Sequence, residues 1–365
     1  MKYNLFKDVK RLIVKIGTSV MSEKNKLNQA CFNNLSGQVA QLLKEKIEVI
    51  VVSSGAICAG MDILGLKNRP KDLPLLQATA AVGQNVLMRM WEKAFGAVGI
   101  KVAQILLTKD DLINRKRYLN ARNTLNALLR RGVVPIVNEN DTVSVDEIKF
   151  GDNDYLSSLV ANLADAQLLI ILSDVDGLYA KGSGLIKVVE RITPAIEALA
   201  CGTTKEISVG GMSSKIEAAK IATNSGISVV VHNGATGNVL IKILREGETG
   251  TLFLPKAKLD SKKRWIAYGS RTSGQLVVDE GAKIALLSKG KSLLSSGIVE
   301  SKGDFKTGDI VSIVDIKGRE YARGLTNYST EEIKKIKGLN SSLIEKTLGY
   351  KYYDEVIHRD NLVIL

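Results

Sequence analysis

The chain has 365 residues, which is too long for one ordinary domain and fits two. Hydrophobic residues make up 45% of the sequence, charged residues make up 24%, and there are only 5 prolines. This composition excludes a disordered or fibrous chain and predicts a globular protein. Lysine and arginine number 51 against 38 aspartates and glutamates, so the formal net charge is +13, which favours anionic partners such as phosphates, carboxylate substrates or nucleic acid.

Cysteine and histidine usage argues against a disulfide framework and a metal centre. Cys31, Cys58 and Cys201 lie far apart without paired spacing, as expected in a reducing cytoplasm. His232 and His358 are too few and too isolated for a histidine-based metal cage. The first residues show no signal peptide, and no run approaches the roughly 18 apolar residues of a membrane span. We therefore expect a cytoplasmic protein without membrane contact.

Between residues 10 and 255, short apolar runs rich in β-branched residues alternate with longer helical patterns. The expected strands cover residues 11–17, 48–54, 101–108, 133–140, 167–174 and 227–234. The expected helices cover residues 29–46, 73–98, 118–131, 153–164 and 212–225. Nearly continuous apolar strands are typical of a sheet that is covered on both faces. The alternation predicts an α/β fold with three layers, in which helices flank a mostly parallel sheet.

The character of the sequence changes after Pro255. Residues 256–274 are basic and lack a clear period, so they are typical of a linker. Beyond them, strand-like and helical runs cover residues 275–279, 280–288, 309–316, 319–328, 330–347 and 361–365. We therefore expect an α/β domain over residues 1–258, a basic linker over 259–273 and a small β-rich domain over 274–365.

The ends of the expected strands carry the candidate site, because ligands of open α/β sheets bind at the carboxyl ends of the strands. Lys15 lies in the apolar first strand, where its ammonium group is costly to bury unless it meets an anion. Gly17 would let backbone N–H groups approach a phosphate closely. The alternative is a lysine that reaches solvent beside an ordinary turn. Ser54 and Gly55 end the second strand and suit either an anion site or a capped helix with a tight turn.

Two clusters of carboxylates and amides lie at neighbouring loops. Residues 138–141 read NEND at the end of a strand, and residues 151–154 read GDND at the start of a helix. Such groups could bind an amino group, orient lysines or help to hold Mg²⁺. Asx turns and helix caps are the alternative explanation of each cluster. Taken together in a basic chain, the two clusters favour an amino-acid substrate.

The segment 210–215 (GGMSSK) starts a helix and combines glycines, hydroxyls and a lysine. Backbone N–H groups, the helix dipole and the ammonium group would face one phosphate there, whereas a simply capped helix is the alternative. The spacing is not that of a P-loop, and no G-x-G-x-x-G follows a strand. If the fold brings Lys15 and Lys215 together, two cations can stabilise phosphoryl transfer. A carboxylate acceptor is already deprotonated, which fits a site without histidine.

The order of these motifs resembles the glutamate 5-kinase family, in which an amino-acid kinase domain precedes a PUA domain. The resemblance spans essentially the whole chain and rests on the segments VKIGTS, SSGAI, LLQATAAVGQ, YLNARNTL, PIVNENDTV, GDNDYLS, LLIILSDVDGLY, GGMSSK, GTLF, KKRWI, VDEGA and HRD. It implies ATP-dependent phosphorylation of the γ-carboxylate of L-glutamate, the first step of proline synthesis from glutamate. It also implies a need for Mg²⁺, whose ligands stay unassigned, a homo-oligomer (dimer or tetramer) and feedback inhibition by proline.

The resemblance also implies roles for individual residues. Lys15 and Lys215 match the lysines that stabilise the phosphoryl group, and Asp154 matches the acidic residue that orients them. The positions that match the glutamate-binding residues of the family are Ser54, Asp141 and Asn153. The positions that match its nucleotide-binding residues are Lys15, Ser173, Asp174, Val209, Gly210, Gly211, Met212, Ser213, Ser214 and Lys215.

Three departures from the family pattern lie on the nucleotide side. Val209 stands where the family usually has a small polar residue or threonine, so a hydroxyl contact to ATP is missing there. Ser173 replaces a common threonine conservatively. The loop after Tyr179, with residues 181–184, is shorter than usual and lacks an Asp-Pro pair. These departures bear on ATP affinity rather than on the chemistry of transfer.

The sequence leaves two alternative functions open and suggests one partner enzyme. One rival keeps the fold and changes the acceptor to N-acetylglutamate, aspartate or uridylate. The other is an RNA-binding protein that acts through the PUA-like domain and the basic residues Lys262, Lys263 and Arg264. Aromatic residues make up only 5% of the chain, which disfavours RNA binding by base stacking. Because an acyl phosphate product is labile, we also expect hand-off to glutamate-5-semialdehyde dehydrogenase.

Overall fold

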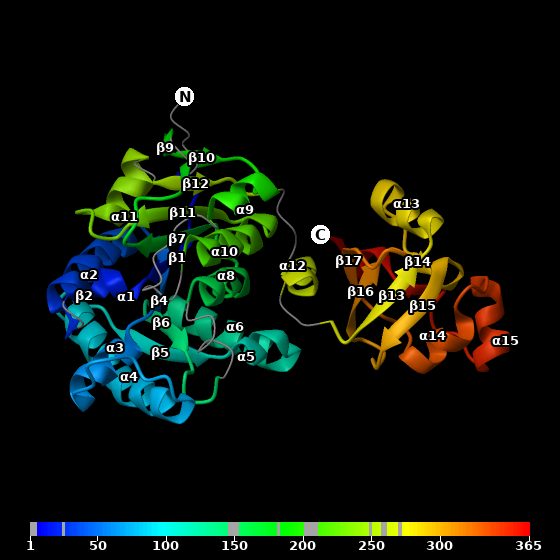
Figure 1. Cartoon of the computed structure of the whole chain (residues 1–365), viewed down its shortest axis with the longest axis horizontal. Helices are drawn as coiled ribbons and strands as arrows, with labels where there is room; N and C mark the ends of the chain where they lie inside the picture. The colour runs from blue at the N-terminus through cyan, green and yellow to red at the C-terminus, as the bar shows by residue number, and fades with distance from the viewer. Residues whose placement is uncertain are drawn as a thin grey trace. The chain divides into compact units, whose positions relative to one another are not determined.

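The computed structural model divides the chain into two units, Met1–Lys258 and Leu259–Leu365 (Figure 1). Each unit has its own hydrophobic core. The structure describes residues 6–23, 26–144, 153–180, 183–200, 211–247, 250–256, 261–268 and 272–365. Within these residues, no helix combines the length and the apolar character needed to cross a membrane.

The first unit is built on an eight-stranded sheet in the order β10-β12-β11-β7-β1-β4-β6-β5. Its neighbouring parallel strands are β5 (Val102–Leu107), β6 (Val134–Glu139), β4 (Glu48–Ser53), β1 (Arg11–Ile16), β7 (Leu168–Ser173) and β11 (Ser228–Asn233). At the other edge, β12 (Thr251–Phe253) is antiparallel to β11, and β10 (Val188–Val189) is parallel to β12. The parallel strands lie where their apolar runs predicted them, because most of their residues are buried on both faces. The predicted fold class is confirmed.

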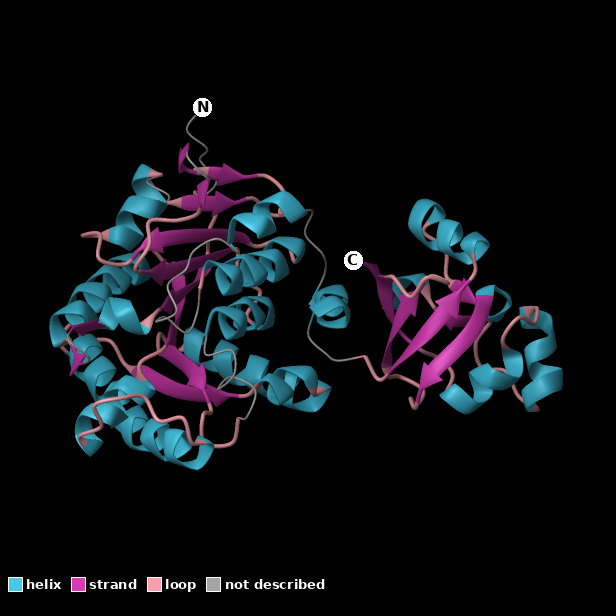
Figure 2. Cartoon of the chain, in the orientation of Figure 1, coloured by secondary structure: helices cyan, strands magenta, loops and turns pink. Residues whose placement is uncertain are grey.

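Helices cover both faces of this sheet (Figure 2). On one face, α2 (Gln29–Lys44) and α4 (Leu73–Gly96) pack with β1 and β4 in the main core. On the other face lie α8 (Asn153–Leu163) and α10 (Met212–Asn224) (Figure 1). The other described elements of the unit are α1 (Thr18–Met21), β2 (Ser22–Glu23), β3 (Lys26–Leu27), α3 (Ala56–Leu64), α5 (Lys109–Ile113), α6 (Arg115–Arg130), β8 (Tyr179–Ala180), β9 (Ser183–Leu185), α9 (Pro194–Ala200), α11 (Val239–Ile241) and η1 (Lys242–Glu246).

Polar side chains and a glycine explain where several of these helices begin and end. The Asn28 side chain accepts a hydrogen bond from the Ala30 N–H at the start of α2. The Asp72 side chain accepts one from the Leu75 N–H at the start of α4. Both caps satisfy N–H groups for which a helix has no internal partner. α3 ends at Gly65, whose φ of +64° stops the helix in a left-handed conformation.

Two glycines bring α3 and α4 together at backbone distance. A Cβ atom on Gly60 would lie 1.8 Å from the Thr79 carbonyl oxygen, and one on Gly83 would lie 1.8 Å from the Ala56 carbonyl oxygen. No other residue fits at either position without moving a helix. Gly55, with φ of +106°, makes the turn from β4 into α3. This packing fixes α4 next to the carboxyl end of β4.

The second unit is a five-stranded sheet with short helices around it. The strands, in sheet order, are β15 (Ile298–Gly303), β13 (Gly274–Val278), β16 (Ile310–Val314), β17 (Glu320–Leu325) and β19 (Leu362–Ile364). The other elements are α12 (Ser261–Tyr268), α13 (Glu280–Lys289), β14 (Leu293–Leu294), η2 (Ser295–Gly297), α14 (Thr330–Ile336), η3 (Ser341–Leu343), α15 (Ile344–Leu348), β18 (Glu355–Ile357) and η4 (Arg359–Asn361). Apolar side chains from all five strands form its core, as a small β-rich domain requires.

The helix α12 lies inside the segment 259–273 that the sequence predicted as a linker. Its residues Trp265, Ile266 and Ala267 are buried against β17 and β19. The Arg323 guanidinium donates a 2.9 Å hydrogen bond from Nη1 to the Ala267 carbonyl oxygen. Short helices with few apolar residues give weak periodicity, so only the packing against the sheet makes this segment helical.

Other elements of the second unit also differ from the expectation, among them the short strands β14 and β18, for which no run was expected. The helical pattern at 330–347 is interrupted, because Gly338 has φ of +75° and its N–H donates to the Ser295 carbonyl oxygen at 2.8 Å. The strand β15 was not expected, because most of its side chains are exposed and polar at a sheet edge.

Candidate active site

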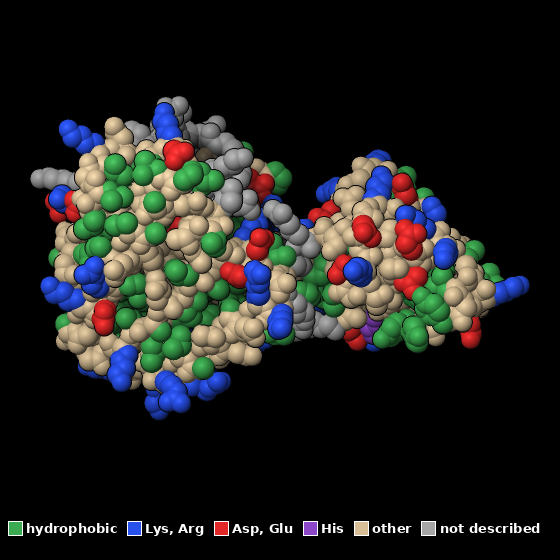
Figure 3. Space-filling model, turned by 90° about the horizontal axis from the view of Figure 1, so that it is seen from below, with side chains coloured by type: hydrophobic (Ala, Val, Ile, Leu, Met, Phe, Trp, Pro, Cys, Tyr) green, Lys and Arg blue, Asp and Glu red, His purple; other side chains and the backbone are tan. Residues whose placement is uncertain are grey.

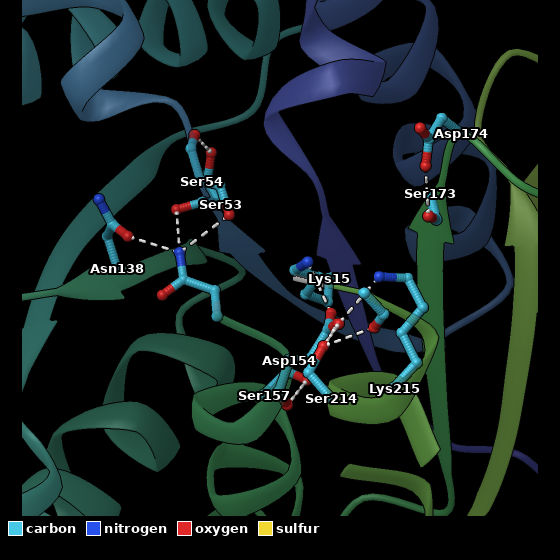
Figure 4. Close-up of polar contacts among 12 residues, drawn as sticks. Lys15, Ser53, Ser54, Asn138, Asp154, Ser157, Ser173, Asp174, Ser214 and Lys215 are labelled. Atoms are coloured by element: carbon cyan, nitrogen blue, oxygen red, sulfur yellow. Dashed lines mark hydrogen bonds and ion pairs between the residues drawn. The ribbon is translucent and has the colours of Figure 1, made fainter. Parts of the chain in front are cut away.

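Two lysines meet one aspartate at the carboxyl end of the central strand of the first unit. Lys15 belongs to β1, Asp154 to the first turn of α8, and Lys215 to the first turn of α10. Lys15 Nζ lies 2.6 Å from Asp154 Oδ1, and Lys215 Nζ lies 3.1 Å from Asp154 Oδ2 (Figure 4). The structure therefore brings together the three residues that the sequence predicted for catalysis, although they come from three distant segments.

The alternation of β1 explains why Lys15 faces this cluster. Leu12, Val14 and Ile16 belong to the core on the α2 and α4 side of the sheet. Successive side chains of a strand face opposite sides, so Lys15 lies on the α8 side. One lysine in the apolar strand thus meets a carboxylate instead of the core.

Burial makes this cluster electrostatically strong. The exposed fractions of Lys15, Lys215 and Asp154 are 3%, 5% and 0%. Attraction between charges is greater away from bulk water, and buried charges are stable only when they are paired. These side chains place two buried ammonium groups at one carboxylate, an arrangement that suits a bound anion such as a phosphoryl group.

The start of α10 adds further groups for an anion. Gly211 is the N-cap residue with extended backbone, no side-chain cap is present among the described residues, and no acidic residue lies in the first turn. Ser214 Oγ lies 3.1 Å from Asp154 Oδ2 and 2.9 Å from the Gly211 carbonyl oxygen, so its hydroxyl contacts the same carboxylate as both lysines. Met212 and Ser213 supply the first N–H groups, and such helix starts favour anions. Val209 and Gly210 lie outside the described residues.

Gly17 lies directly after β1. Its N–H donates to the Leu172 carbonyl oxygen at 3.1 Å, so this N–H joins the end of β1 to β7. A Cβ atom at Gly17 would lie 3.4 Å from that oxygen and 3.8 Å from Lys15 Nζ, which are ordinary contacts.

A cluster of amides and hydroxyls lies on the β4 and β6 side of the lysines (Figure 4). Asn153 Nδ2 shares its two hydrogens among three acceptors within hydrogen-bond distance: the Ser53 carbonyl oxygen at 3.1 Å, Ser54 Oγ at 3.1 Å and Asn138 Oδ1 at 2.8 Å. Asn138 Nδ2 donates in turn to Gln84 Oε1 at 2.7 Å. Of these residues the sequence assigned a role only to Ser54 and Asn153. The structure adds Asn138 and Gln84, and the NEND motif was the only signal for the former.

Asp141 follows β6 and lies beside two other charged groups. Burial and the negative charge of Glu139 raise the pKa of the Asp141 carboxyl to about 6, while the Arg69 guanidinium opposes that rise. A carboxylate in such surroundings would be stabilised by an ammonium group of a ligand. Its position and charge fit the predicted contact with an amino acid.

Ser173 ends β7 and Asp174 follows it, on the other side of the lysines from Ser54 (Figure 4). Ser173 Oγ donates to Asp174 Oδ1 at 3.0 Å, and the Asp174 side chain is exposed. Next to them, Asp176 accepts hydrogen bonds from Asn233 Nδ2 at 3.0 Å and from the Tyr179 hydroxyl at 2.9 Å. The hydrogen bond from Asn233 has the larger effect and that from Tyr179 adds to it, and both lower the pKa of the Asp176 carboxyl. The sequence alone indicated no role for Asp176, Asn233 or Tyr179. Residues 181–182 of the neighbouring loop lie outside the described residues.

Comparisons with known proteins agree with this arrangement. Residues 10–233 match the model of the amino acid kinase family, and residues 274–348 match that of the PUA domain. Glutamate 5-kinase from Thermoanaerobacter sp. (strain X514) is 51% identical over 363 residues, which cover 97% of this chain and 98% of that protein. Glutamate 5-kinase from Syntrophotalea carbinolica is 49% identical over 371 residues and is covered completely, as is this chain.

The chain belongs to the glutamate 5-kinase family. Carbamate kinase from Giardia lamblia bound to AMP-PNP superposes with a TM-score of 0.49 and 15% identity over 68% of this chain and 99% of that one. The relatives at about half identity match the whole length, so both units belong to the family architecture.

The groups present fit the nucleotide that a glutamate 5-kinase uses. Two buried ammonium groups and the start of α10 at Gly211 suit the phosphates of ATP. Mg²⁺ bound with a nucleotide takes most of its ligands from phosphate and water and needs only one or two carboxylates. Within the described residues there is no group of three acidic, histidine or cysteine side chains that could hold a metal by itself.

Proposed function

We propose that this chain transfers the γ-phosphoryl group of ATP to the γ-carboxylate of L-glutamate, giving L-glutamyl 5-phosphate in the first step of proline synthesis. One observation carries the proposal. Asp154 holds the ammonium groups of Lys15 and Lys215 together between the amide cluster at the ends of β4 and β6 and the start of α10. An amino acid on one side and a nucleotide on the other would meet at the lysines.

The transfer needs positioning and charge stabilisation rather than proton transfer. The γ-carboxylate of glutamate is ionised at neutral pH and attacks the γ-phosphorus directly, while ADP leaves with the electron pair of the broken P–O bond. Lys15 and Lys215 stabilise the charge on the transferring oxygens, and Asp154 keeps both ammonium groups in place. Mg²⁺, when bound with the nucleotide, neutralises further phosphate charge.

The two substrates divide the remaining residues between them. We assign glutamate to Ser54, Asp141 and Asn153, with the raised pKa of Asp141 supporting a contact to the α-ammonium group. The residues assigned to the nucleotide are Lys15, Ser173, Asp174, Val209, Gly210, Gly211, Met212, Ser213, Ser214 and Lys215. For Val209 and Gly210 this assignment rests on the sequence alone.

The stability of the product bears on what happens to it after transfer. An acyl phosphate is labile, so we propose hand-off to glutamate-5-semialdehyde dehydrogenase in the cytoplasm. We further propose a homo-oligomer, a dimer or a tetramer, with proline as a feedback inhibitor. Gel filtration with light scattering measures the first property, and inhibition by proline at fixed L-glutamate measures the second. Coupled flux that stays constant as the two enzymes are concentrated together would contradict direct hand-off.

Formation of a hydroxamate from ATP, Mg²⁺, L-glutamate and hydroxylamine tests the proposed reaction. We expect a signal with L-glutamate that is lost in Lys15→Ala and Lys215→Ala. Lys220→Ala is the matched control, because Lys220 lies on the same helix as Lys215 but pairs with Glu197 at the surface, at 2.6 Å. Turnover of ATP only with N-acetylglutamate, aspartate or uridylate would keep the fold and overturn the substrate.

The charges of the second unit bear on the RNA-binding alternative. Lysine and arginine side chains on the face shown in Figure 3 lie among acidic side chains. Lys283 pairs with Asp315 at 3.0 Å, and Lys334 pairs with Glu331 at 2.9 Å. Paired cations release few counterions, so phosphate contacts gain little from them. These pairs favour the kinase function, and retention of structured RNA at 0.2 M salt would contradict that preference.

A further inference from the structure

The amide cluster forms a relay that begins on α4 and ends at the candidate amino-acid site. Gln84 Oε1 accepts from Asn138 Nδ2 at 2.7 Å, and Asn138 Oδ1 accepts from Asn153 Nδ2 at 2.8 Å. Figure 4 shows the Asn138 oxygen directed at the amide nitrogen that also meets Ser53 and Ser54. A relay of this kind has a direction, because each amide has one donor end and one acceptor end.

Both ends of the relay fix that direction. The Ser53 carbonyl oxygen can only accept, so the Asn153 atom 3.1 Å from it is the donor nitrogen. Asn138 must then accept from Asn153 with its oxygen Oδ1. Its nitrogen Nδ2 therefore faces α4, where it needs a hydrogen-bond acceptor. Asn138 is 2% exposed, so its N–H group has no water to replace that acceptor. Gln84 Oε1 supplies it.

The fixed direction decides what Asn153 offers to a ligand. With all described contacts of its side chain made by Nδ2, the carbonyl oxygen Oδ1 is the free end of the relay. An oxygen acceptor recognises an ammonium group and has nothing to offer a carboxylate. The relay therefore makes the site selective for a substrate with an α-amino group.

Gln84 is held in this arrangement at a cost to stability. Its Nε2 atom is buried, and none of the described residues accepts a hydrogen bond from it. A buried unpaired donor destabilises a fold by about 1–3 kcal/mol, and an apolar side chain of the same shape would avoid that. The close packing of α3 and α4 at Gly60 and Gly83 fixes the helix that carries it. Such a residue is typical of functional selection.

We propose that Gln84 is a positioning residue that holds Asn138 from the α4 end and, together with the Ser53 carbonyl oxygen, keeps the oxygen of Asn153 toward the α-ammonium group of the substrate. The inference rests on the proposed function and extends it from a catalytic site to a source of substrate specificity. It predicts that removing the acceptor on α4 weakens recognition of the amino group and leaves the nucleotide side untouched.

The test compares L-glutamate with glutarate, which lacks the amino group, in Gln84→Met and Gln84→Glu. For Gln84→Met we expect kcat/KM for L-glutamate to fall about tenfold, because one buried hydrogen bond is lost. The value for glutarate and the KM for ATP should stay within about twofold of wild type. Gln84→Glu keeps an acceptor for Asn138 in either protonation state, so it should retain the selectivity. Gln77→Met is the matched control on the same helix, since its Nε2 donates to the Ser144 carbonyl oxygen at 3.3 Å, outside the relay.

Thermal unfolding of the same variants tests whether Gln84 positions the amino-acid site or only stabilises the fold. Gln84→Met replaces the unpaired donor of Gln84 by that of Asn138, so we expect an unchanged unfolding temperature. If this variant does not fold, Gln84→Ala removes the same acceptor without added volume and must lose the same selectivity. An equal fall for both substrates, or no change in their ratio, overturns the inference while the proposed function stands. A wild-type chain without activity on L-glutamate overturns both.

Discussion

The indole Nε1–H of Trp91 donates a 2.9 Å hydrogen bond to Ser53 Oγ and so joins the hydrophobic core to the last residue of β4. Trp91 is fully buried, with its ring 4.5 Å from that of Phe32 in an edge arrangement and 5.7 Å from that of Phe95. The Ser53 carbonyl oxygen accepts from Asn153 on the opposite side of the sheet. One strand end therefore connects the packing of α4 with the candidate site.

Replacement of Trp91 by phenylalanine should cost stability and leave binding nearly intact. Trp91→Phe loses one buried hydrogen bond and some ring volume, so we expect the free energy of unfolding to fall by about 2 kcal/mol. The Ser53 carbonyl oxygen stays in place because β4 is paired on both sides. The KM for L-glutamate should change less than about threefold. Urea unfolding and steady-state kinetics measure the two effects, and a large KM change at unchanged stability would contradict this view.

Neutralising Asp154 should affect both catalysis and folding. Asp154→Asn leaves two ammonium groups without the carboxylate between them, so we expect kcat to fall at least about 100-fold. The free energy of unfolding should fall by about 3–5 kcal/mol, as when one partner of a buried ion pair is removed. Glu197→Gln is the control, because it breaks an exposed pair with Lys220 and should cost less than about 1 kcal/mol. Equal effects of the two substitutions would refute the special role of Asp154.

The pKa of Asp141 predicts how substrate capture depends on pH. A carboxyl with a pKa of about 6 is mostly protonated at pH 5 and mostly ionised at pH 7. Only the ionised form attracts an ammonium group, so kcat/KM for L-glutamate should rise about tenfold over this range and then level. Asp141→Asn removes the titrating group and should abolish the rise. A rise of the same size in this variant would assign it to another group.

Two glycines of α4, Gly83 and Gly96, provide a test substitution and its control for the packing of α3 on α4. Gly83→Ala places a methyl group 1.8 Å from the Ala56 carbonyl oxygen, so we expect a loss of about 3 kcal/mol or more in the free energy of unfolding. Gly96→Ala meets nothing within 4 Å and should gain about 0.5–1 kcal/mol from better helix propensity. Chemical denaturation measures both. A mild effect at Gly83 would show that the two helices can move apart freely.

The sequence predicted the parallel strands of the first unit well, because a strand buried on both faces must be apolar along its whole length. It also predicted that Lys15 and Lys215 act together, although only the order of the sheet brings β1 next to α8 and α10. It could not predict Gln84, because a single amide on a helix carries no signal until its partner on another element is known. Nor could it predict that the Gly17 N–H pairs with β7, because that bond depends on the order of the strands in the sheet.

The burial of α12 decides where the chain can be divided. Trp265, Ile266 and Ala267 lie against the sheet of the second unit, and Arg323 holds the carbonyl oxygen of Ala267. A fragment that ended at residue 273 would carry this apolar helix without the strands that cover it, and exposed apolar surface promotes aggregation. A fragment that ended at residue 258 would leave the helix with its own sheet. The part of the C-terminal unit that can fold by itself thus begins before its first strand, among basic residues whose sequence alone suggests a linker.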